Sequence, residues 1–199
     1  MMAVDIVVLP TEDIIDMAVA INQHLEQDKI SLNKKDCVPH VSIAMGCVKE
    51  ENLRHVCNVI KDISRNFPRI RLKVEGIVAT CFDDKKVQWL KVSLTDHLRK
   101  LHEEVMKRVR RYFCYDAKRN MFIGDVDKAT VEWVKNYAKS SSFDKFSPHI
   151  TLGFGELKMG QNQVSFNAEK IALFQLGNHC TCKKLLASYK FRGDYKKLE

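Results

Sequence analysis

A short pattern occurs twice in the chain and constrains its fold more than any other feature. The first copy lies in Val38–Gly46 and the second in Phe146–Phe154, more than a hundred positions later. Each copy reads Pro-His-apolar-hydroxyl-apolar-small. Because the apolar residues alternate with the others, each copy predicts a strand with one buried face and one face that carries the histidine.

The histidine and the hydroxyl residue share one face of each predicted strand. His40 and Ser42 lie on it in the first copy, and His149 and Thr151 lie on it in the second. The proline before each histidine presets an extended backbone, which suits the start of a strand. A small residue four positions after each histidine shares this face and is expected to leave room for a ligand.

Each motif alone would fit an ordinary strand histidine, and the repetition favours a catalytic site. Two imidazoles with pKa values near neutrality can act as general base and general acid. Two hydroxyls can bind the non-bridging oxygens of a phosphate. The paired motifs therefore predict acid–base chemistry on a phosphate group.

The length and apolar content allow one domain or two small lobes. The chain has 199 residues, of which 45% are hydrophobic, so it can bury a core without cross-links. Its seven cysteines are scattered and follow no cleavable signal peptide, which indicates a reducing compartment. No stretch approaches the ~18 apolar residues of a membrane span. We expect a cytoplasmic or nuclear monomer without a membrane partner.

The positive charge is concentrated in the second half of the chain. The net charge is +8, and residues 101–199 hold 18 Lys and Arg against 11 Asp and Glu. This bias favours an anionic partner such as a nucleotide or RNA, although a solvated basic face is equally consistent with it.

Hydrophobic periodicity predicts strands and helices in an order that repeats. Each half reads strand, helix, motif strand and strand, which indicates an internal repeat of residues 3–81 and 86–191 with an irregular insertion at Cys114–Val126. Such a repeat implies two lobes related by a pseudo-two-fold axis, with the motifs facing each other. We expect strands over residues 3–9, 69–81, 87–94, 164–176 and 183–191, and helices over residues 11–27, 50–65 and 127–139, with another helix after residue 95.

The two motifs resemble those of the 2H phosphoesterase superfamily, which is named for two His-x-Ser/Thr motifs facing each other across a cleft. The matching segments are His40–Ile43 and His149–Leu152. The resemblance covers nearly the whole chain, including the opening strand and helix and the closing hairpin. It implies one bilobal α+β domain over residues 1–199, with antiparallel sheets around a central cleft.

The resemblance also implies a function. Members of this superfamily include 2′,3′-cyclic nucleotide and 2′-5′ phosphodiesterases, which act without a metal or another cofactor. Carried over by position, the catalytic residues are His40 and His149, and the phosphate-binding residues are Ser42 and Thr151. We therefore expect a phosphodiesterase for nucleotides, oligonucleotides or RNA that acts at the ribose 2′ position.

Alternatives to this function remain open at the level of sequence. One is a 2′-5′ oligoadenylate or cyclic dinucleotide phosphodiesterase that modulates immune signalling, and another is a ligase that runs the reverse reaction. A third is a module that binds nucleotide or RNA without catalysis, which the two intact motifs disfavour. The pattern does not assign the base and the acid between the two histidines.

Further candidates lie outside the motifs. Lys118 and Arg119 of the irregular insertion are candidates for approaching a substrate. His179–Cys182 resembles half a zinc site, but a structural zinc needs four ligands and the sequence has no second cluster, so no metal is expected. Four aromatic residues are candidates for stacking on a base, although strand aromatics more often belong to the core: Trp89, Tyr115, Phe122 and Phe174.

Overall fold

The computed structural model describes residues 1–82, 85–157 and 163–192, and this part contains two antiparallel sheets and four α-helices joined by loops and short 3-10 helices. No helix within it is both long and apolar enough to span a membrane. The elements follow the chain in this order: β1 (Met2–Leu9), α1 (Glu12–Asn22), β2 (Val41–Val48), η1 (Glu50–Asn52), α2 (Leu53–Asn66), β3 (Ile70–Phe82), β4 (Lys85–Val92), α3 (Asp96–Val109), β5 (Phe113–Cys114), η2 (Arg119–Met121), α4 (Lys128–Ser140), η3 (Phe143–Lys145), β6 (His149–Phe154), β7 (Val164–Ala168), β8 (Lys170–Leu176), η4 (Asn178–Cys180) and β9 (Cys182–Lys190).

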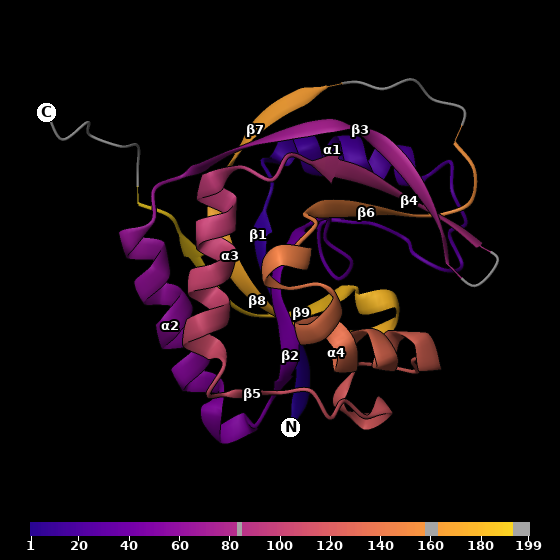
Figure 1. Ribbon diagram of the computed structural model, residues 1–199. Helices are drawn as coiled ribbons and strands as arrows, with labels where there is room; N and C mark the ends of the chain where they lie inside the picture. Colours follow the sequence, from indigo (N-terminus) through magenta and orange to yellow (C-terminus); the bar gives the residue numbers. More distant parts are fainter. Residues whose placement is uncertain (83–84, 158–162, 193–199) are drawn as a thin grey trace, which may run out of the picture.

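Each sheet takes strands from both halves of the chain. The larger sheet has the order β5-β2-β1-β8-β9, and the smaller sheet has the order β6-β4-β3-β7 (Figure 1). Strand β8, from the second half, pairs with β1, while β3, from the first half, pairs with β4. All these pairings are antiparallel, which confirms the expected α+β fold with two antiparallel sheets.

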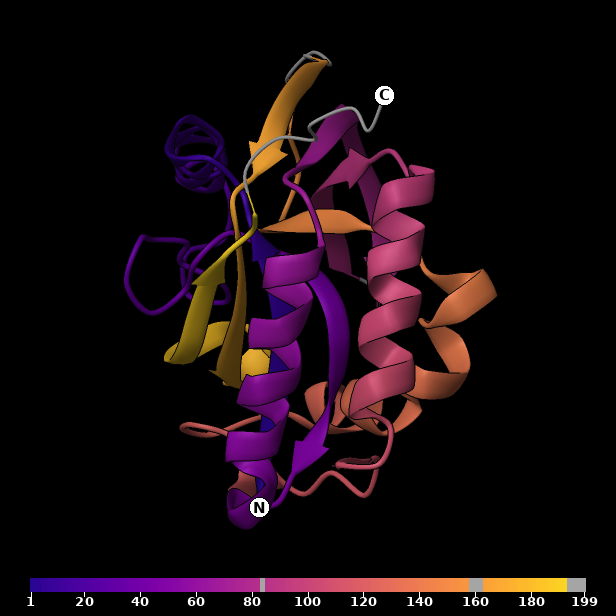
Figure 2. The same ribbon diagram turned by 90° about the vertical axis from the view of Figure 1, so that its left-hand side faces the viewer.

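The helices pack on the sheets through apolar faces. Figure 2 shows α2 and α3 side by side. Helix α2 contacts β8 and β9, and α3 contacts β2. Helix α2 buries Val56, Ile60 and Ile63, whose spacing of three or four residues puts them on one face. Helix α1 packs against β6, and α4 packs against β2 and η4, so α4 lies beside the first motif strand.

One predicted strand differs from the observed structure. The strand expected over residues 164–176 is two strands that separate at Glu169. Ala168 pairs with Ile70 in the smaller sheet, and Lys170 pairs with Leu9 in the larger sheet. The prediction was wrong because alternation along a strand does not show which sheet each part joins.

The first helix is also shorter than predicted, since it ends at Asn22 instead of near residue 27. The Asn22 side chain is 1% exposed and binds three backbone groups outside the helix. Its amide nitrogen donates to the carbonyls of Ile30 at 2.8 Å and Leu152 at 2.7 Å, and its oxygen accepts from the N–H of Leu32 at 2.8 Å. These bonds fasten the segment before the first motif to the strand of the second motif.

Candidate active site

The two motifs lie on different sheets and line one cavity. Strand β2 carries the first motif in the larger sheet, and β6 carries the second in the smaller sheet. The cavity between them has a volume of about 380 Å³ and is lined by His40, Ser42, His149 and Thr151. Small-molecule sites have volumes of ~300–1,000 Å³. The fold thus brings the four predicted site residues together around a space of suitable size.

The neighbouring strands position the two hydroxyl residues in a similar way. Ser42 lies opposite Val7 of β1, and Thr151 lies opposite Trp89 of β4. Each pairing adjoins a shift in the strand register, in β1 and in β4 respectively. Such irregularities redirect side chains and are common beside active sites.

Both imidazoles make the same backbone contact. The Nδ1 atom of His40 lies 2.7 Å from the carbonyl oxygen of Val38, and that of His149 lies 2.8 Å from the carbonyl oxygen of Ser147. Because a carbonyl oxygen only accepts, each Nδ1 must carry the proton. The neutral form of each ring therefore has its lone pair on Nε2, where it is available for proton transfer.

Burial lowers the pKa values of both imidazoles below the ordinary value for histidine. Burial, with a smaller contribution from the charge of nearby His149, lowers the pKa of His40 to about 4. Burial also lowers the pKa of His149. The carbonyl contacts oppose both shifts without overcoming them. In the free protein both rings are therefore neutral at neutral pH.

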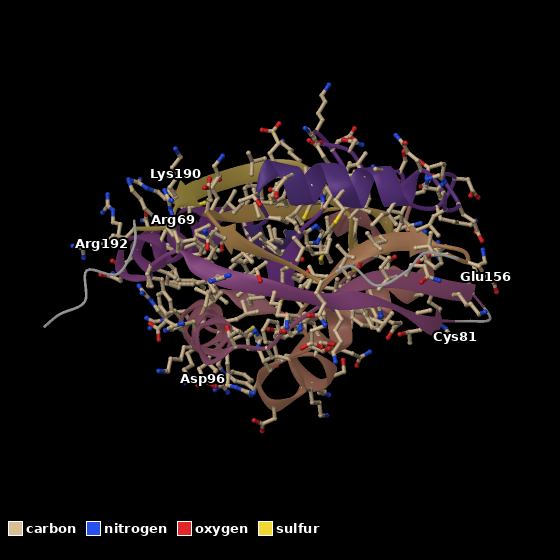
Figure 3. The ribbon with its side chains drawn as sticks, turned by 90° about the horizontal axis from the view of Figure 1, so that it is seen from above. Arg69, Cys81, Asp96, Glu156, Lys190 and Arg192 are labelled. Atoms are coloured by element: carbon tan, nitrogen blue, oxygen red, sulfur yellow. The ribbon has the colours of Figure 1, made fainter. Side chains whose placement is uncertain are left out.

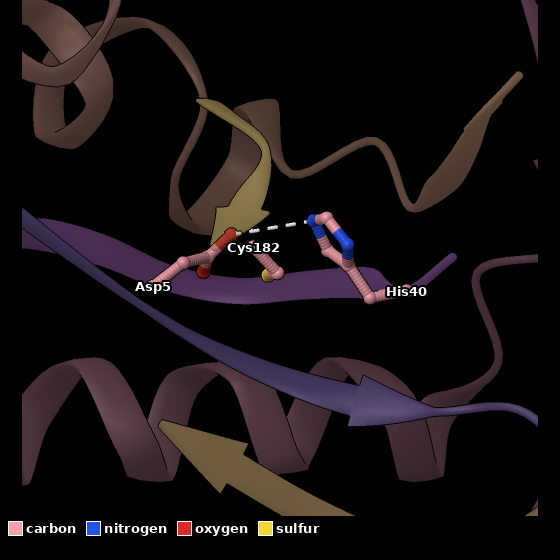
Figure 4. A group of neighbouring side chains, drawn as sticks. All are labelled: Asp5, His40 and Cys182. Carbon is pink, nitrogen blue, oxygen red and sulfur yellow. Dashed lines mark ion pairs between the residues drawn. The ribbon is translucent and has the colours of Figure 1, made fainter. Parts of the chain in front are cut away.

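Asp5 belongs to the site and was missed by the sequence analysis. It is 0% exposed, accepts a hydrogen bond of 2.6 Å from the Ser42 hydroxyl, and has an oxygen 3.7 Å from His40 Nε2 (Figure 4). Burial raises the pKa of this carboxyl well above its usual value. The available signal was a single acidic residue inside an otherwise apolar strand, because such a group must find a buried partner.

Helix α4 forms another wall of the cavity. Trp133 lines it with 38% of its surface exposed, and Tyr137, one turn later, lines it as a buried residue. Lys145 is the one lysine or arginine that lines the cavity in the described part of the chain. The cavity lining thus includes an accessible aromatic ring from α4 and a positive charge from η3, and neither residue was predicted from the sequence.

The four aromatic candidates lie in different places. Trp89 lines the cavity and packs against His149, with ring centroids 4.4 Å apart at 60°. Phe122 and Phe174 are 6% and 2% exposed, and both belong to the core. Tyr115 packs against the core, and burial raises its pKa to about 12. The last three do not line the cavity, so they are not placed to stack on a ligand there.

Most of the described basic residues lie on the outer surface and do not line the cavity. Lys118 and Arg119 are not among the lining residues, and Lys118 pairs instead with Asp116 at 3.3 Å. The basic helix α3 contributes nothing to the described cavity lining either. Figure 3 shows charged side chains around the periphery, with Lys190 and Arg192 together at one end. The charge bias of the second half therefore describes the outer surface.

The small residue at the end of each motif was expected to leave room for a ligand, and the structure shows that it does not. Gly153 has φ +142°, and a Cβ atom there would lie 2.9 Å from the amide nitrogen of Asn22 and 3.3 Å from Leu25. Ala44 is 0% exposed within the core. The prediction was wrong because α1 occupies the space next to Gly153.

Comparisons with known proteins agree with this architecture. The sequence profile of the 2′-5′ RNA ligase superfamily matches residues 16–174. A search of curated proteins gave no sequence match. Among solved structures, the protein TT0787 of Thermus thermophilus is 16% identical with a TM-score of 0.62, and the match covers 98% of this chain and 100% of that one.

LigT of E. coli has the same fold. Its complex with NADP+ is 12% identical to this chain with a TM-score of 0.60, covering 96% of this chain and 98% of LigT. Its complex with ATP is 10% identical with a TM-score of 0.58, covering 96% and 97%. With a family profile over most of its length and this fold, the chain belongs to the 2′-5′ RNA ligase superfamily of 2H phosphoesterases.

Proposed function

We propose that the protein is a metal-independent phosphodiesterase that acts on nucleotide or RNA substrates at the ribose 2′ position. The observation that carries this proposal is that the imidazoles of the two motifs, whose strands belong to different sheets, line one cavity. Each histidine has Nδ1 held by a backbone carbonyl, which leaves Nε2 for chemistry. Membership of the 2H phosphoesterases supports the same reaction type.

The proposed reaction needs one proton removed and one supplied. With a 2′,3′-cyclic phosphate, one histidine takes a proton from water as the water oxygen bonds to phosphorus. The phosphorus–oxygen bond to the departing ribose oxygen breaks, and the other histidine gives that oxygen its proton. Each transfer contributes ~10²–10⁴-fold to the rate. Thr151 binds the phosphate oxygens, whose charge increases during the step, and Ser42 does so when its hydroxyl turns from Asp5 to the phosphate.

The cavity also offers a place for the base of a nucleotide. Trp133 presents an exposed ring on the α4 wall, and aromatic stacking holds bases regardless of their sequence. The solved complexes of LigT contain NADP+, ATP and 3′-AMP, which supports a nucleotide as the ligand class. We therefore place the phosphate between the two histidines and the base against Trp133.

A substrate panel tests this function. The panel contains 2′,3′-cyclic mononucleotides, 2′-5′ and 3′-5′ oligonucleotides and cyclic dinucleotides, and products are separated by chromatography. We expect turnover of a 2′,3′-cyclic phosphate or a 2′-5′ linkage, with 3′-5′ oligonucleotides left intact. Binding of these compounds without turnover of any of them would contradict the proposal and favour a binding module.

Metal independence has its own test. Turnover should persist after exhaustive chelation, because both proton transfers are assigned to imidazoles. The measurement is kcat/KM before and after treatment with excess EDTA. Loss of activity that a divalent ion restores would contradict the two-histidine mechanism.

A further inference from the structure

We propose that Asp5, His40 and Cys182 form a binding site for a zinc-like divalent cation, and that a cation bound there inhibits the enzyme. The binding site follows from side-chain geometry alone. The inhibition rests in addition on the function proposed above, in which His40 transfers a proton.

The three residues come from separate parts of the chain at the larger sheet, and their side chains converge (Figure 4). Two of them, His40 and Cys182, line the cavity. Asp5 belongs to β1, His40 directly precedes β2, and Cys182 begins β9. One potential ligand atom from each of them lies within 4.8 Å of the other two. Asp5 and Cys182 are 0% exposed, whereas His40 lines the open cavity. Small side-chain movements would bring all three donors onto one ion.

The donor set fits zinc better than a hard cation. Zinc binds imidazole nitrogen, thiolate sulfur and carboxylate oxygen, whereas calcium and magnesium prefer oxygen ligands. Three protein ligands leave a fourth tetrahedral position, as in zinc sites that keep an exchangeable water. Here that position would face the cavity, because His40 and Cys182 both line it.

An independent observation also points to a ligand at Asp5. Its Oδ1 atom is buried and has no hydrogen-bond partner within the described residues, although its Oδ2 atom accepts from Ser42. A buried carboxyl oxygen without a partner is costly. A cation would supply that partner, and its charge would also stabilise a buried thiolate at Cys182.

The arrangement changes the interpretation of the segment His179–Cys182. His179 points to Asp127, with its Nδ1 atom 3.5 Å from the carboxylate, and so does not join Cys182. Cys180 lines the cavity but lies outside the group of three. The segment therefore supplies one ligand, and the other two, Asp5 and His40, come from distant parts of the sequence.

A cation at this site would bind the Nε2 atom of His40, because Nδ1 already contacts the carbonyl of Val38. A coordinated nitrogen has no lone pair for a proton. Zinc would therefore block the proton transfer assigned to His40. This is a different outcome from a metal that takes part in the reaction, since removing zinc would raise the rate.

Cobalt titration of metal-free protein tests the binding site without any measurement of turnover. Tetrahedral cobalt with a thiolate ligand shows a near-ultraviolet sulfur-to-cobalt charge-transfer band and intense visible bands. We expect these bands to saturate at one equivalent of Co²⁺ and to disappear when Zn²⁺ displaces it. Absence of the charge-transfer band in the wild-type protein would overturn the proposal.

Variants identify the ligands. Loss of a residue that merely supports a ligand lowers metal affinity about 10–100-fold, so loss of a ligand should cost at least about tenfold. Cys182→Ser should remove the charge-transfer band and weaken binding by that factor, and Asp5→Asn should weaken binding while keeping the band. Cys180→Ser is the matched control and should behave as the wild type. A band that survives in Cys182→Ser, or is lost in Cys180→Ser, would overturn the assignment.

Inhibition is measured as the rate with zinc divided by the same protein's rate without it. Zinc should inhibit the wild-type enzyme, and Cys182→Ser should require at least about tenfold more zinc. If cobalt binds as expected but zinc leaves turnover unchanged, the inhibitory role is wrong. If no substrate is turned over, the proposed function fails, while the cobalt titration still decides the binding site.

Discussion

At the scale of single residues, the burial of His40 and His149 determines how the proposed enzyme responds to pH. Both pKa values lie below the ordinary ~6.5 of histidine, with that of His40 at about 4. The reaction needs one neutral and one protonated ring. We therefore expect kcat/KM to follow a bell-shaped curve with its maximum on the acid side of pH ~6.5, measured with a substrate that does not titrate there.

Bound phosphate changes this expectation in a defined direction. Its negative charge favours the protonated rings and raises both pKa values, so the maximum of kcat should lie at higher pH than that of kcat/KM. The apparent pKa values belong to the interacting pair. A kcat/KM that climbs steadily to the alkaline limit would show that no histidine acts as an acid.

Trp133 gives a second prediction at this scale. Stacking of a base on an aromatic ring is worth ~1–3 kcal/mol, so Trp133→Ala should raise KM for a nucleotide substrate roughly tenfold with little change in kcat. Trp133→Phe should retain most of the affinity. Ribose 2′,3′-cyclic phosphate, which lacks a base, serves as the control substrate, and an equal KM increase for it would refute stacking.

Residues could be predicted where their pattern is local. His40, Ser42, His149 and Thr151 are recognisable because each pair is separated by one residue on one strand, and the pair recurs. Trp133 could not be placed, because its spacing along α4 is the same whether that face meets the core or a cavity. Only the packing of α4 on β2 decides between these.

At the scale of elements, Asn22 connects α1, the loop before the first motif and β6 through three buried hydrogen bonds. Asn22→Ala would leave three backbone groups unpaired, each costing ~1–3 kcal/mol, so the free energy of unfolding should fall by about 3 kcal/mol or more. Urea unfolding monitored by circular dichroism measures this.

The matched control for this prediction is Asn66→Ala. Asn66 is also the last residue of a helix, but within the described residues its exposed amide donates to Asp62 alone. Its replacement should change the free energy of unfolding by less than ~0.5 kcal/mol. Similar losses in the two variants would mean that the buried bonds of Asn22 do not fasten these elements together.

His102 shows why contacts between elements escape sequence analysis. It is 0% exposed, its Nδ1 donates to the carbonyl of Ile43 at 2.7 Å, and its Nε2 accepts from the N–H of Phe143 at 2.8 Å. This neutral ring links the strand that carries Ser42 to the turn that precedes His149. Periodicity places a residue on a helix but does not identify partners from distant segments.

At the scale of the whole molecule, each sheet contains strands from both halves of the chain, so both halves build the cavity between the sheets. β8 completes the sheet that carries the first motif, and β3 completes the sheet that carries the second. The antiparallel α+β class could be predicted from the sequence. The exchange of strands could not be predicted. Pairing within one half of the chain and pairing between the halves both satisfy the same alternation of apolar residues.

The central claim is that two histidines from distant parts of the chain act together in one site. Replacing either with alanine should therefore reduce kcat by about 10²–10⁴-fold or more, while binding of a product nucleotide weakens much less. Groups that act as a unit show non-additive losses. The double variant should then be little slower than the slower single variant.

The deciding measurement is kcat for the wild type, His40→Ala, His149→Ala and the double variant on the substrate that the panel identifies. The account predicts two inactive single variants and a double variant with no further large loss. A near-wild-type rate in either single variant, or losses that multiply in the double variant, would contradict it.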